Sequence, residues 1–506
     1  MKKTGKKQKN KGQKKKLNRQ IVFITILFSA LFVYMSYYIA DYSLKNRTEL
    51  ISNSYNGRAK ILAAQNMRGT IYSNDKTVLV SSSVNEDGNE VRNYNYGNMF
   101  AHIVGYATNG RMGVESYANY YLINSNAPVS VKASMDAKGE KYPGDSVFTT
   151  LDVDIQKTAY EAMGMYQGAI IVTEPSTGKI LALVSKPDFD PAQIQYTWDE
   201  LINHTGSSIL LNRVTQGSYP PGSTFKIITA LEYIRENPTS FNNYSYNCVG
   251  QIKHGEDVIR CYHGSVHGLV DFDKSFAKSC NSSFANIGLT LNRDEFGKTL
   301  DNLLFNKELP TSLSASTNKL VVDANTDDSD MIQVSIGQGK ANISPLQLNM
   351  ITCAIANNGV LMEPYVIDRV ENQQGTLIKD FKEVKYGSLM TEDEAGILQD
   401  LMVDVVENGT ATRLKGQSYY AAGKTGSAEY GTIKGESHAW FTGFAGREVE
   451  GIRNPADISV TIIIEGAGTG GDYAVPIAKR IFDTYYDKLA NAKAISSSDS
   501  TEENDS

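Results

Sequence analysis

A serine followed three residues later by a lysine can place a nucleophile beside a base, because residues three apart share one face of a helix. The pattern starts at Ser73, Ser176, Ser223, Ser275 and Ser316. Only Ser223 follows a helix-start signal, Pro-Pro-Gly at 220–222, and it opens an apolar-periodic segment that ends before Pro238. A helix start also favours negative charge, since its backbone N–H groups are free. Ser223 and Lys226 are therefore the candidate nucleophile and base.

A lysine works as a base only where burial or a second cation lowers its pKa, so another cation should lie nearby. Lys-Thr-Gly occurs at 3–5 and at 424–426, and the second copy lies in a strand-like run. Its glycine would let the backbone of a ligand approach closely. Among several Ser-x-Asn triplets, Ser-Cys-Asn at 279–281 lies between the other two motifs in chain order. The chain thus contains an ordered set of three motifs.

The first 40 residues carry the signals of a membrane anchor. Residues 1–20 hold ten basic residues and no acidic one, and residues 21–40 form an uncharged apolar run. A helix of that length spans about 30 Å, the hydrocarbon thickness of a bilayer. Positive charge before the run keeps the N-terminus inside, so we expect a single-pass protein of the cell membrane whose remaining residues are extracytoplasmic. A cleaved signal peptide is the alternative, but the run exceeds a signal core and no Ala-x-Ala site follows.

The charge balance differs on the two sides of this anchor. The formal net charge of the chain is −6, whereas residues 21–506 carry 40 basic and 56 acidic residues, net −16. This balance argues against a nucleic-acid partner. A hydrophobic content of 41% and four cysteines in 506 residues exclude a disordered chain and a disulfide-dense mini-protein. The anchor also separates the Lys-Thr-Gly at 3–5 from Ser223, which leaves 424–426 as the relevant copy.

The pattern of apolar residues divides the exported part into two regions and a tail. Residues 41–150 are polar, with alternating, strand-like segments at 70–80 and 129–151. The region 151–490 begins with a helix-like segment at 152–166 and a strand-turn-strand at 168–184. It ends with strand-like runs at 419–428, 439–445 and 458–465 and a helix-like run at 474–489. Strands at both ends of one region predict an α+β domain closed by its own termini. Residues 491–506 are rich in serine and acidic residues, which predicts a disordered tail.

The three ordered motifs resemble those of the penicilloyl-serine transferases, which comprise penicillin-binding proteins and serine β-lactamases. The flanking segments NRVTQGSYPPGSTFK, DKSFAKSCNSSF, SIGQGKANISPLQL, AAGKTGSAEY and HAWFTGFA are similar to a class B penicillin-binding protein. Upstream, Arg-Gly-Thr-Ile at 68–71 and Gly-Val-Glu at 113–115 resemble the pedestal motifs of that class.

The resemblance covers most of residues 60–488, and it implies a complete domain order. A basic cytoplasmic arm (1–20) and a transmembrane signal anchor (21–40) would precede a small β-rich pedestal, or dimerisation-like domain (41–150). The transpeptidase domain (151–490) would be α+β and β-lactamase-like, with a central antiparallel sheet flanked by helices.

The resemblance also implies the catalytic roles. Ser223 would be the nucleophile acylated by the D-Ala-D-Ala end of a cell-wall stem peptide, and Lys226 would take its proton. Ser279 would relay a proton to the leaving D-alanine nitrogen. Asn281 would bind a substrate amide and orient Lys226.

The Lys-Thr-Gly segment would bind the substrate. Lys424 would supply the charge that keeps Lys226 partly neutral and, with the hydroxyls of Thr425 and Ser427, would hold the substrate carboxylate. Gly426 belongs to the same substrate-binding strand. The backbone N–H groups of Ser223 and Ser427 would form the oxyanion hole.

The resemblance implies a serine-type D,D-transpeptidase, an acyltransferase that cross-links peptidoglycan and is acylated by β-lactams. The alternatives are a hydrolase, either a D,D-carboxypeptidase or a β-lactamase, and a non-catalytic β-lactam-binding scaffold. The segment SLSASTNKL lacks the glutamate that would deacylate the enzyme in a class A β-lactamase. No cofactor is implied. A membrane glycan polymerase of the elongation or division machinery would be the partner, because a cross-linking enzyme needs fresh strands.

The spacing of the histidines and cysteines outside these motifs does not match that of a metal site. His263 and His267 fit a helix face, but the glycines beside them disfavour a helix, so we expect no metal. Cys248 and Cys261 flank a predicted hairpin, and the sequence does not decide whether they form a disulfide. Cys280 is expected to be a packing residue beside the site.

Overall fold

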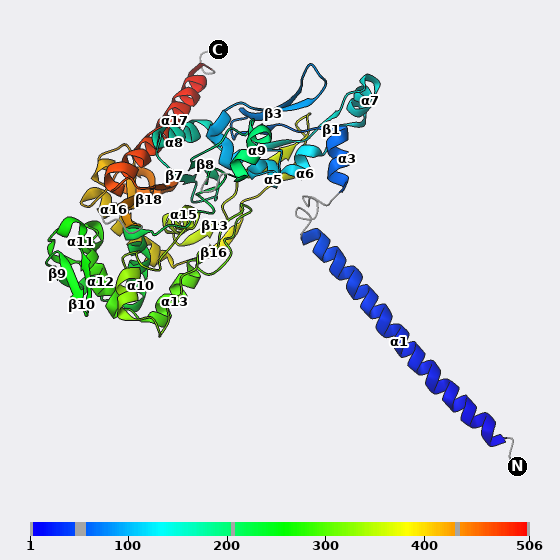
Figure 1. Ribbon diagram of the computed structural model, residues 1–506, viewed down its shortest axis with the longest axis horizontal. Coiled ribbons are helices and arrows are strands. Elements are labelled where there is room, and N and C mark those ends of the chain that lie inside the picture. Colours follow the sequence, from blue (N-terminus) through cyan, green and yellow to red (C-terminus); the bar gives the residue numbers. More distant parts are fainter. Residues whose placement is uncertain (1–3, 46–56, 204–207, 431–435, 503–506) are drawn as a thin grey trace. The chain divides into compact units, whose positions relative to one another are not determined.

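Residues 4–45, 57–203, 208–430 and 436–502 are described in a computed structural model, which divides into the units Met1–Gln65 and Asn66–Ser506. The first unit contains α1 (Thr4–Lys45) and α3 (Gly57–Gln65). Figure 1 shows α1 as one continuous helix. Within it, Asn18–Ser43 is long and apolar enough to cross a membrane, in agreement with the anchor expected at 21–40.

A five-stranded antiparallel sheet forms the centre of the second unit. In spatial order its strands are β17 (Tyr420–Glu429), β18 (Ser437–Val449), β19 (Ile452–Ile464), β7 (Gly168–Thr173) and β8 (Ile180–Lys186). All six residues of β7 are buried, as its run of Ala, Ile and Val predicts. β19 pairs with β7, with Val460 opposite Val172, so strands from the two ends of the domain meet as expected.

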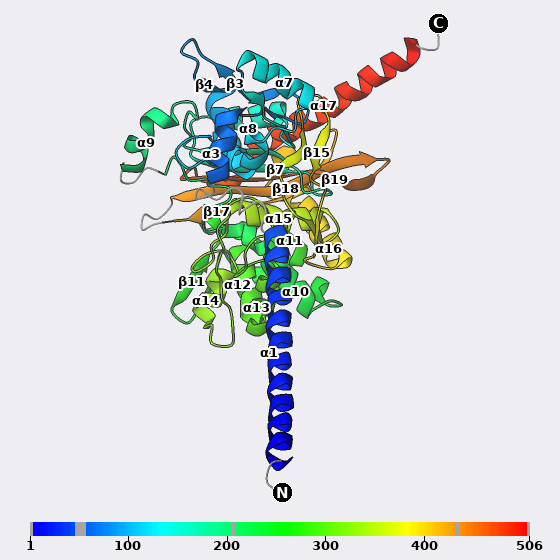
Figure 2. The ribbon, with the colours of Figure 1, turned by 90° about the vertical axis from the view of Figure 1, so that its right-hand side faces the viewer.

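Helices cover both faces of this sheet, as Figure 2 shows. On one face lie α8 (Val153–Met163) and α17 (Val475–Glu502), which pack against each other. On the other lies α15 (Pro345–Ala356), whose twelve residues are all buried and whose first turn is capped by Ser344. α16 (Glu392–Glu407) lies beside α15 and packs against β17. Beyond α15 lie α10 (Lys226–Glu236), α11 (Phe272–Ala277), α12 (Asn281–Thr290), α13 (Arg293–Asn302) and α14 (Asp328–Val334). The α+β class with a central antiparallel sheet flanked by helices is thus confirmed.

A second sheet of six strands contains most of the strands from the region 41–150, which the sequence predicts to be a pedestal. In spatial order it comprises β15 (Leu377–Asp380), β14 (Ile367–Glu371), β6 (Ser146–Thr149), β2 (Ile71–Tyr72), β3 (Val78–Val84) and β4 (Glu90–Tyr94). Four of these strands come from the region 41–150. The hairpin β14–β15 comes from the region 151–490, so the two regions share one sheet.

The remaining described strands form four two-stranded sheets, and the remaining helices are short. They are β1 (Asn66–Met67), β5 (Tyr142–Pro143), β9 (Ser245–Cys248), β10 (Gln251–His254), β11 (Asp257–Arg260), β12 (Gly268–Asp271), β13 (Val360–Met362), β16 (Lys385–Ser388), α4 (Ala101–Val104), α5 (Gly113–Tyr117), α6 (Asn119–Ile123), α7 (Val129–Lys138) and α9 (Ile194–Asn203).

In two segments the secondary structure differs from what the sequence pattern predicts. The strand-like alternation expected over 129–151 is wrong for its first half, because α7 occupies Val129–Lys138. Val129 is 84% exposed and no residue of α7 is buried, so the alternating apolar residues do not pack against a core as they would in a strand. Gly139, in the left-handed conformation, ends the helix. In addition, α17 continues to Glu502, through most of the segment for which the sequence predicts disorder. Residues 503–506 lie outside the described residues.

The two pedestal motifs meet through a buried ion cluster. Glu115 is fully buried, and its carboxylate accepts hydrogen bonds from Arg68 Nε at 2.6 Å and Arg92 Nε at 2.7 Å. Arg68 also donates to Asn119 Oδ1 at 2.8 Å. Burial opposes ionisation of Glu115, but the two guanidinium groups outweigh it and hold the pKa of this carboxyl below its usual value.

Replacing Glu115 by glutamine should destabilise the protein by about 3–5 kcal/mol, because two buried guanidinium groups would lose their shared anion. Calorimetric unfolding of the full chain in detergent would measure the loss. Since the folded-state pKa is lowered, this stabilisation is complete above the unfolded pKa of about 4.3 and is lost as the pH falls further. Glu295→Gln, which removes the exposed pair with Lys298, is the control and should cost under about 1 kcal/mol. Equal losses in both variants would contradict the prediction.

Candidate active site

Ser223 lies in the turn that leads into α10. One turn of 3-10 helix, Gly222–Phe225, is followed directly by α10. Gly222 has a φ of 53°, in the left-handed region that favours glycine, and its N–H donates to the carbonyl of Gly337 at 2.9 Å. This tight approach holds the start of the helix, with Ser223 half-buried and Lys226 fully buried one turn later.

The buried amine of Lys226 contacts the Ser-x-Asn motif. Its Nζ donates to the carbonyl oxygen of Ser279 at 2.8 Å, to Asn281 Oδ1 at 2.6 Å and to Ser279 Oγ at 3.2 Å. Among the described residues, no hydrogen bond joins Lys226 Nζ to Ser223 Oγ. Nucleophile and base are often loosely spaced before substrate binds, so this geometry is compatible with the pair predicted from the sequence.

Ser279 connects the two lysines. Its Oγ accepts from Lys424 Nζ at 2.9 Å as well as from Lys226 Nζ. Ser279 has a φ of 55°, an uncommon conformation for a residue with a side chain, which persists only where the surroundings impose it. The three motifs therefore converge on one hydroxyl, which lies between two buried lysine amines.

Burial sets the proton affinity of both amines. It lowers the pKa of Lys226 to about 7, against an opposing effect of the Cys280 and Cys261 sulfurs. It also lowers the pKa of Lys424 well below its usual range, and the neighbouring charge of Lys226 lowers it further. The sequence-based expectation was that Lys424 keeps Lys226 neutral; in the structure, burial is the main cause. A lysine with a pKa near neutrality can act as a base at physiological pH.

The Lys-Thr-Gly segment lies on β17, the edge strand of the central sheet. Thr425 and Ser427 are two residues apart and so share one face of the strand, along an edge to which an extended peptide could add. Thr425 Oγ1 lies 2.6 Å from Thr410 Oγ1, a partner that no sequence motif marks. An added Cβ at Gly426 would lie 2.9 Å from the carbonyl oxygen of Pro221. The glycine therefore allows a close approach within the chain itself, and the close approach of a ligand to this strand stays a prediction.

Two aromatic rings complete the surroundings of the amines, and neither ring was predicted. Lys226 Nζ lies 5.5 Å from the ring centroid of Phe284, and Lys424 Nζ lies 5.6 Å from that of Phe276. The negative faces of aromatic rings stabilise nearby cations at low solvation cost. Both phenylalanines flank the Ser-x-Asn motif in DKSFAKSCNSSF, so their proximity to this motif was the available signal.

The chain matches two known families. Residues 168–483, more than half of the chain, match the penicillin binding protein transpeptidase domain. Residues 68–147 match the penicillin binding protein A dimerisation domain.

Individual relatives agree with these matches. The peptidoglycan D,D-transpeptidase PbpA of Mycolicibacterium smegmatis is 28% identical over 434 residues, which cover 79% of this chain and 86% of that protein. The peptidoglycan D,D-transpeptidase MrdA of Acinetobacter baumannii is 28% identical over 452 residues, and the match covers 78% of this chain and 65% of MrdA. The imipenem acyl-enzyme complex of penicillin-binding protein A from M. tuberculosis superposes with a TM-score of 0.74 at 25% identity, over 83% of this chain and 99% of that one. With the fold and the order of its motifs, these matches establish that the chain belongs to the penicillin-binding protein transpeptidases, as a member of class B.

Proposed function

We propose that this chain is a peptidoglycan D,D-transpeptidase that works through an acyl-enzyme on Ser223. One observation carries the assignment: the Oγ of Ser279 accepts hydrogen bonds from both Lys226 and Lys424, beside the helix start that bears Ser223. This arrangement supplies a hydroxyl nucleophile, a buried amine and a hydroxyl that can pass protons. The acyl-enzyme complex of the M. tuberculosis relative supports covalent catalysis in this family.

Acylation starts from Lys226 in its neutral form. Lys226 Nζ takes the proton of Ser223 Oγ as this oxygen attacks the carbonyl carbon between the two D-alanines. The C–N bond then breaks, and the departing D-alanine nitrogen receives a proton from Ser279 Oγ, which regains one from Lys226. The donor peptide is left as an ester on Ser223, and every group except Ser223 has its starting protons again.

The acceptor strand completes the cycle. Its amine attacks the ester carbonyl, its proton passes to Lys226, and Ser223 Oγ recovers a proton as it leaves, so that an amide cross-link forms. A β-lactam acylates Ser223 by the same first step. Its ring amide opens, but the leaving nitrogen stays attached, so it blocks the acceptor.

The edge strand β17 binds the substrate. The charge of Lys424 and the hydroxyls of Thr425 and Ser427 hold the carboxylate of the terminal D-alanine, with Gly426 keeping this strand close to Pro221. The N–H groups of Ser223 and Ser427 receive the oxyanion, and losing one such donor typically costs about 10²–10³ in rate.

The candidate span within α1 supports a single-pass anchor in the cell membrane, and we propose that the catalytic domain faces outward. The substrate lies on that side. We also propose a membrane glycan polymerase of the elongation or division machinery as partner, since a chain that only cross-links depends on newly polymerised strands.

A stem peptide ending in D-Ala-D-Ala, offered to the full-length protein with an amine acceptor, tests the function. Mass spectrometry should detect D-alanine release and an acceptor-linked product in excess of the hydrolysed peptide. Release with hydrolysed peptide alone would indicate a carboxypeptidase, and rapid turnover of a β-lactam would indicate a β-lactamase. If neither D-alanine release nor a stable β-lactam adduct is detected, the remaining function is that of a non-catalytic scaffold.

The acylation rate should rise with pH through about 7, because the neutral form of Lys226 is the base and burial lowers its pKa to about 7. At higher pH, Lys424 should lose its charge earlier than an ordinary lysine and weaken carboxylate binding. The measurement is the second-order rate constant for acylation by a fluorescent penicillin across a pH series at constant ionic strength. A rate that is independent of pH from about 5 to 9 would contradict a titrating base.

A further inference from the structure

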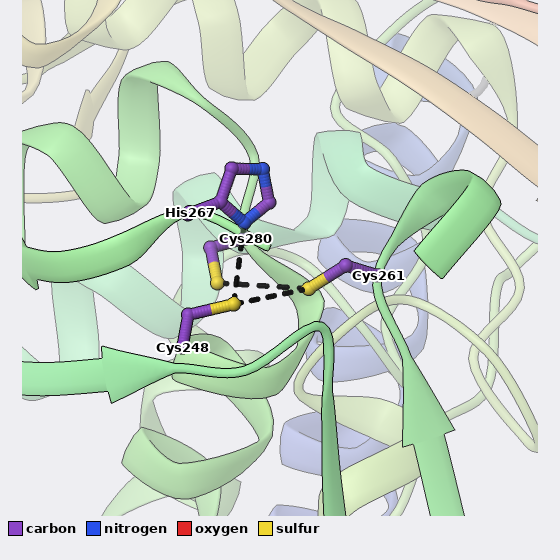
Figure 3. A group of neighbouring side chains, drawn as sticks. All are labelled: Cys248, Cys261, His267 and Cys280. Atoms are coloured by element: carbon purple, nitrogen blue, oxygen red, sulfur yellow. Dashed lines mark hydrogen bonds between the residues drawn. The ribbon is translucent and has the colours of Figure 1, made fainter. Parts of the chain in front are cut away.

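Three cysteines and a histidine converge beside the Ser-x-Asn motif (Figure 3). The Sγ atoms of Cys248 and Cys261 are 3.7 Å apart, as are those of Cys261 and Cys280. Nδ1 of His267 lies 3.4 Å from Cys248 Sγ. All four ligand atoms lie within 4.8 Å of one another. Figure 3 shows the four side chains pointing toward a common centre.

We propose that these four side chains hold a zinc ion that fixes the Ser-x-Asn motif; the positioning role rests on the proposed function. Zinc bonds to sulfur at about 2.3 Å and, at tetrahedral angles, sets sulfurs about 3.8 Å apart. The spacings of 3.7 Å fit the edges of such a tetrahedron. Three thiolates and one imidazole form a closed structural set, which favours zinc over magnesium or calcium.

The environment of the sulfurs suits a metal better than a disulfide. Cys248, Cys261 and Cys280 are free and at most 2% exposed. A disulfide needs its sulfurs about 2.0 Å apart, and three cysteines cannot all pair with one another. Cys248 Sγ accepts hydrogen bonds from the Gly250 N–H at 3.4 Å and from Ser282 Oγ at 3.2 Å. Donors of this kind stabilise ligating thiolates.

Histidine spacing alone gave no reason to expect this site. The four ligands are separated in sequence by 12, 5 and 12 residues, so none forms a short metal-binding motif with another. They come from the ends of strands β9, β11 and β12 and the start of α12, which the fold brings together. Cys280, which we expected only to pack beside the site, is the ligand that belongs to the motif itself.

Cys280 links the metal ligands to catalysis. It lies between Ser279 and Asn281, both of which accept hydrogen bonds from Lys226. Asn281 Nδ2 also donates to the carbonyl of Arg260 at 2.9 Å, and the next residue is the ligand Cys261. A zinc ion bonded to Cys261 and Cys280 would therefore brace Asn281 from both sides and hold Ser279 in its left-handed conformation.

Metal analysis of the full-length protein, purified in detergent under reducing conditions without chelator, tests the site. We expect one zinc per chain. In cobalt-exchanged protein we expect the intense charge-transfer and visible bands of tetrahedral thiolate ligation. The Cys248→Ser variant should lose both the zinc and the cobalt bands. The Cys248→Asp variant should retain a metal, with altered cobalt bands. The Cys353→Ser variant is the matched control. Cys353 is a buried cysteine of α15 outside the cluster, and its variant should keep the metal.

Zinc-free protein with no cobalt bands, or a Cys248–Cys261 disulfide found by peptide mapping, would overturn the site. For the positioning role, removing zinc with a chelator should slow the saturating acylation rate about 10–100-fold, with little change in the half-saturating β-lactam concentration, and added zinc should restore it. An unchanged acylation rate after zinc loss would overturn the positioning role. If zinc-loaded protein is not acylated at all, the proposed function fails and the positioning role with it, while the metal content is unaffected.

Discussion

The Ser223→Ala variant should form no covalent adduct with any β-lactam and should release no D-alanine from a stem peptide. In the proposed mechanism Ser223 Oγ forms the ester, so its removal eliminates the intermediate. In serine hydrolases, loss of the nucleophile costs about 10⁶ in rate. Intact-mass spectrometry after exposure to benzylpenicillin measures the result directly, because the wild-type protein should gain the mass of the drug and the variant should gain none.

Ser176→Ala is a matched control for this experiment. Ser176 begins another Ser-x-x-Lys pattern, but it is exposed in the turn between β7 and β8. Its variant should be acylated at the wild-type rate, and both variants should melt at nearly the wild-type temperature. An adduct that persists in Ser223→Ala, located by peptide mapping, would assign the nucleophile to another residue and overturn the proposed mechanism.

The proposed catalytic groups could be selected from the sequence because each lies in a short motif whose chemistry depends on residue type. Ser223 and Lys226 are three residues apart, and one helical turn brings them together whatever the rest of the fold. Lys424 and Ser279 are 145 residues apart in the chain. The need for a second cation and the order of the motifs pointed to Lys424, but its hydrogen bond to Ser279 Oγ was not predicted. Thr410, the partner of Thr425, has no such signal, since a lone threonine fits any loop.

The features that the sequence did not predict share a physical cause. Tertiary packing determines the secondary structure and the long-range contacts that a local residue pattern does not determine. Residues 129–138 alternate like a strand, yet with no buried face available they form α7. The hairpin β14–β15 joins the six-stranded sheet from more than 200 residues downstream, and no local sequence pattern indicates this pairing. The cluster of three cysteines and His267 is likewise invisible along the chain, because each ligand lies at the end of a different strand or at a helix start.

Lys226→Met and Lys226→Arg should both lose about 10²–10⁴ in the acylation rate constant, the usual contribution of a general base. Methionine keeps most of the side-chain volume without an amine. Arginine keeps the positive charge but stays protonated at any working pH, so it cannot accept the proton of Ser223. The pair of variants separates a base from a fixed charge, since a purely electrostatic role would be retained by arginine alone. Stopped-flow measurement with a fluorescent penicillin gives both rate constants.

A small amine provides the decisive control. Lys226→Ala opens space for a methylamine molecule, which should restore part of the rate with the pH dependence of its own pKa, whereas the methionine variant leaves no room and should not respond. Melting temperatures measured on the same samples show whether each variant is folded, because the buried amine also holds Asn281 and Ser279 in place. Wild-type acylation in Lys226→Arg would assign this lysine to charge stabilisation. The proton of Ser223 would then pass through Ser279 Oγ to the neutral form of Lys424, whose pKa burial lowers and whose Nζ contacts that hydroxyl.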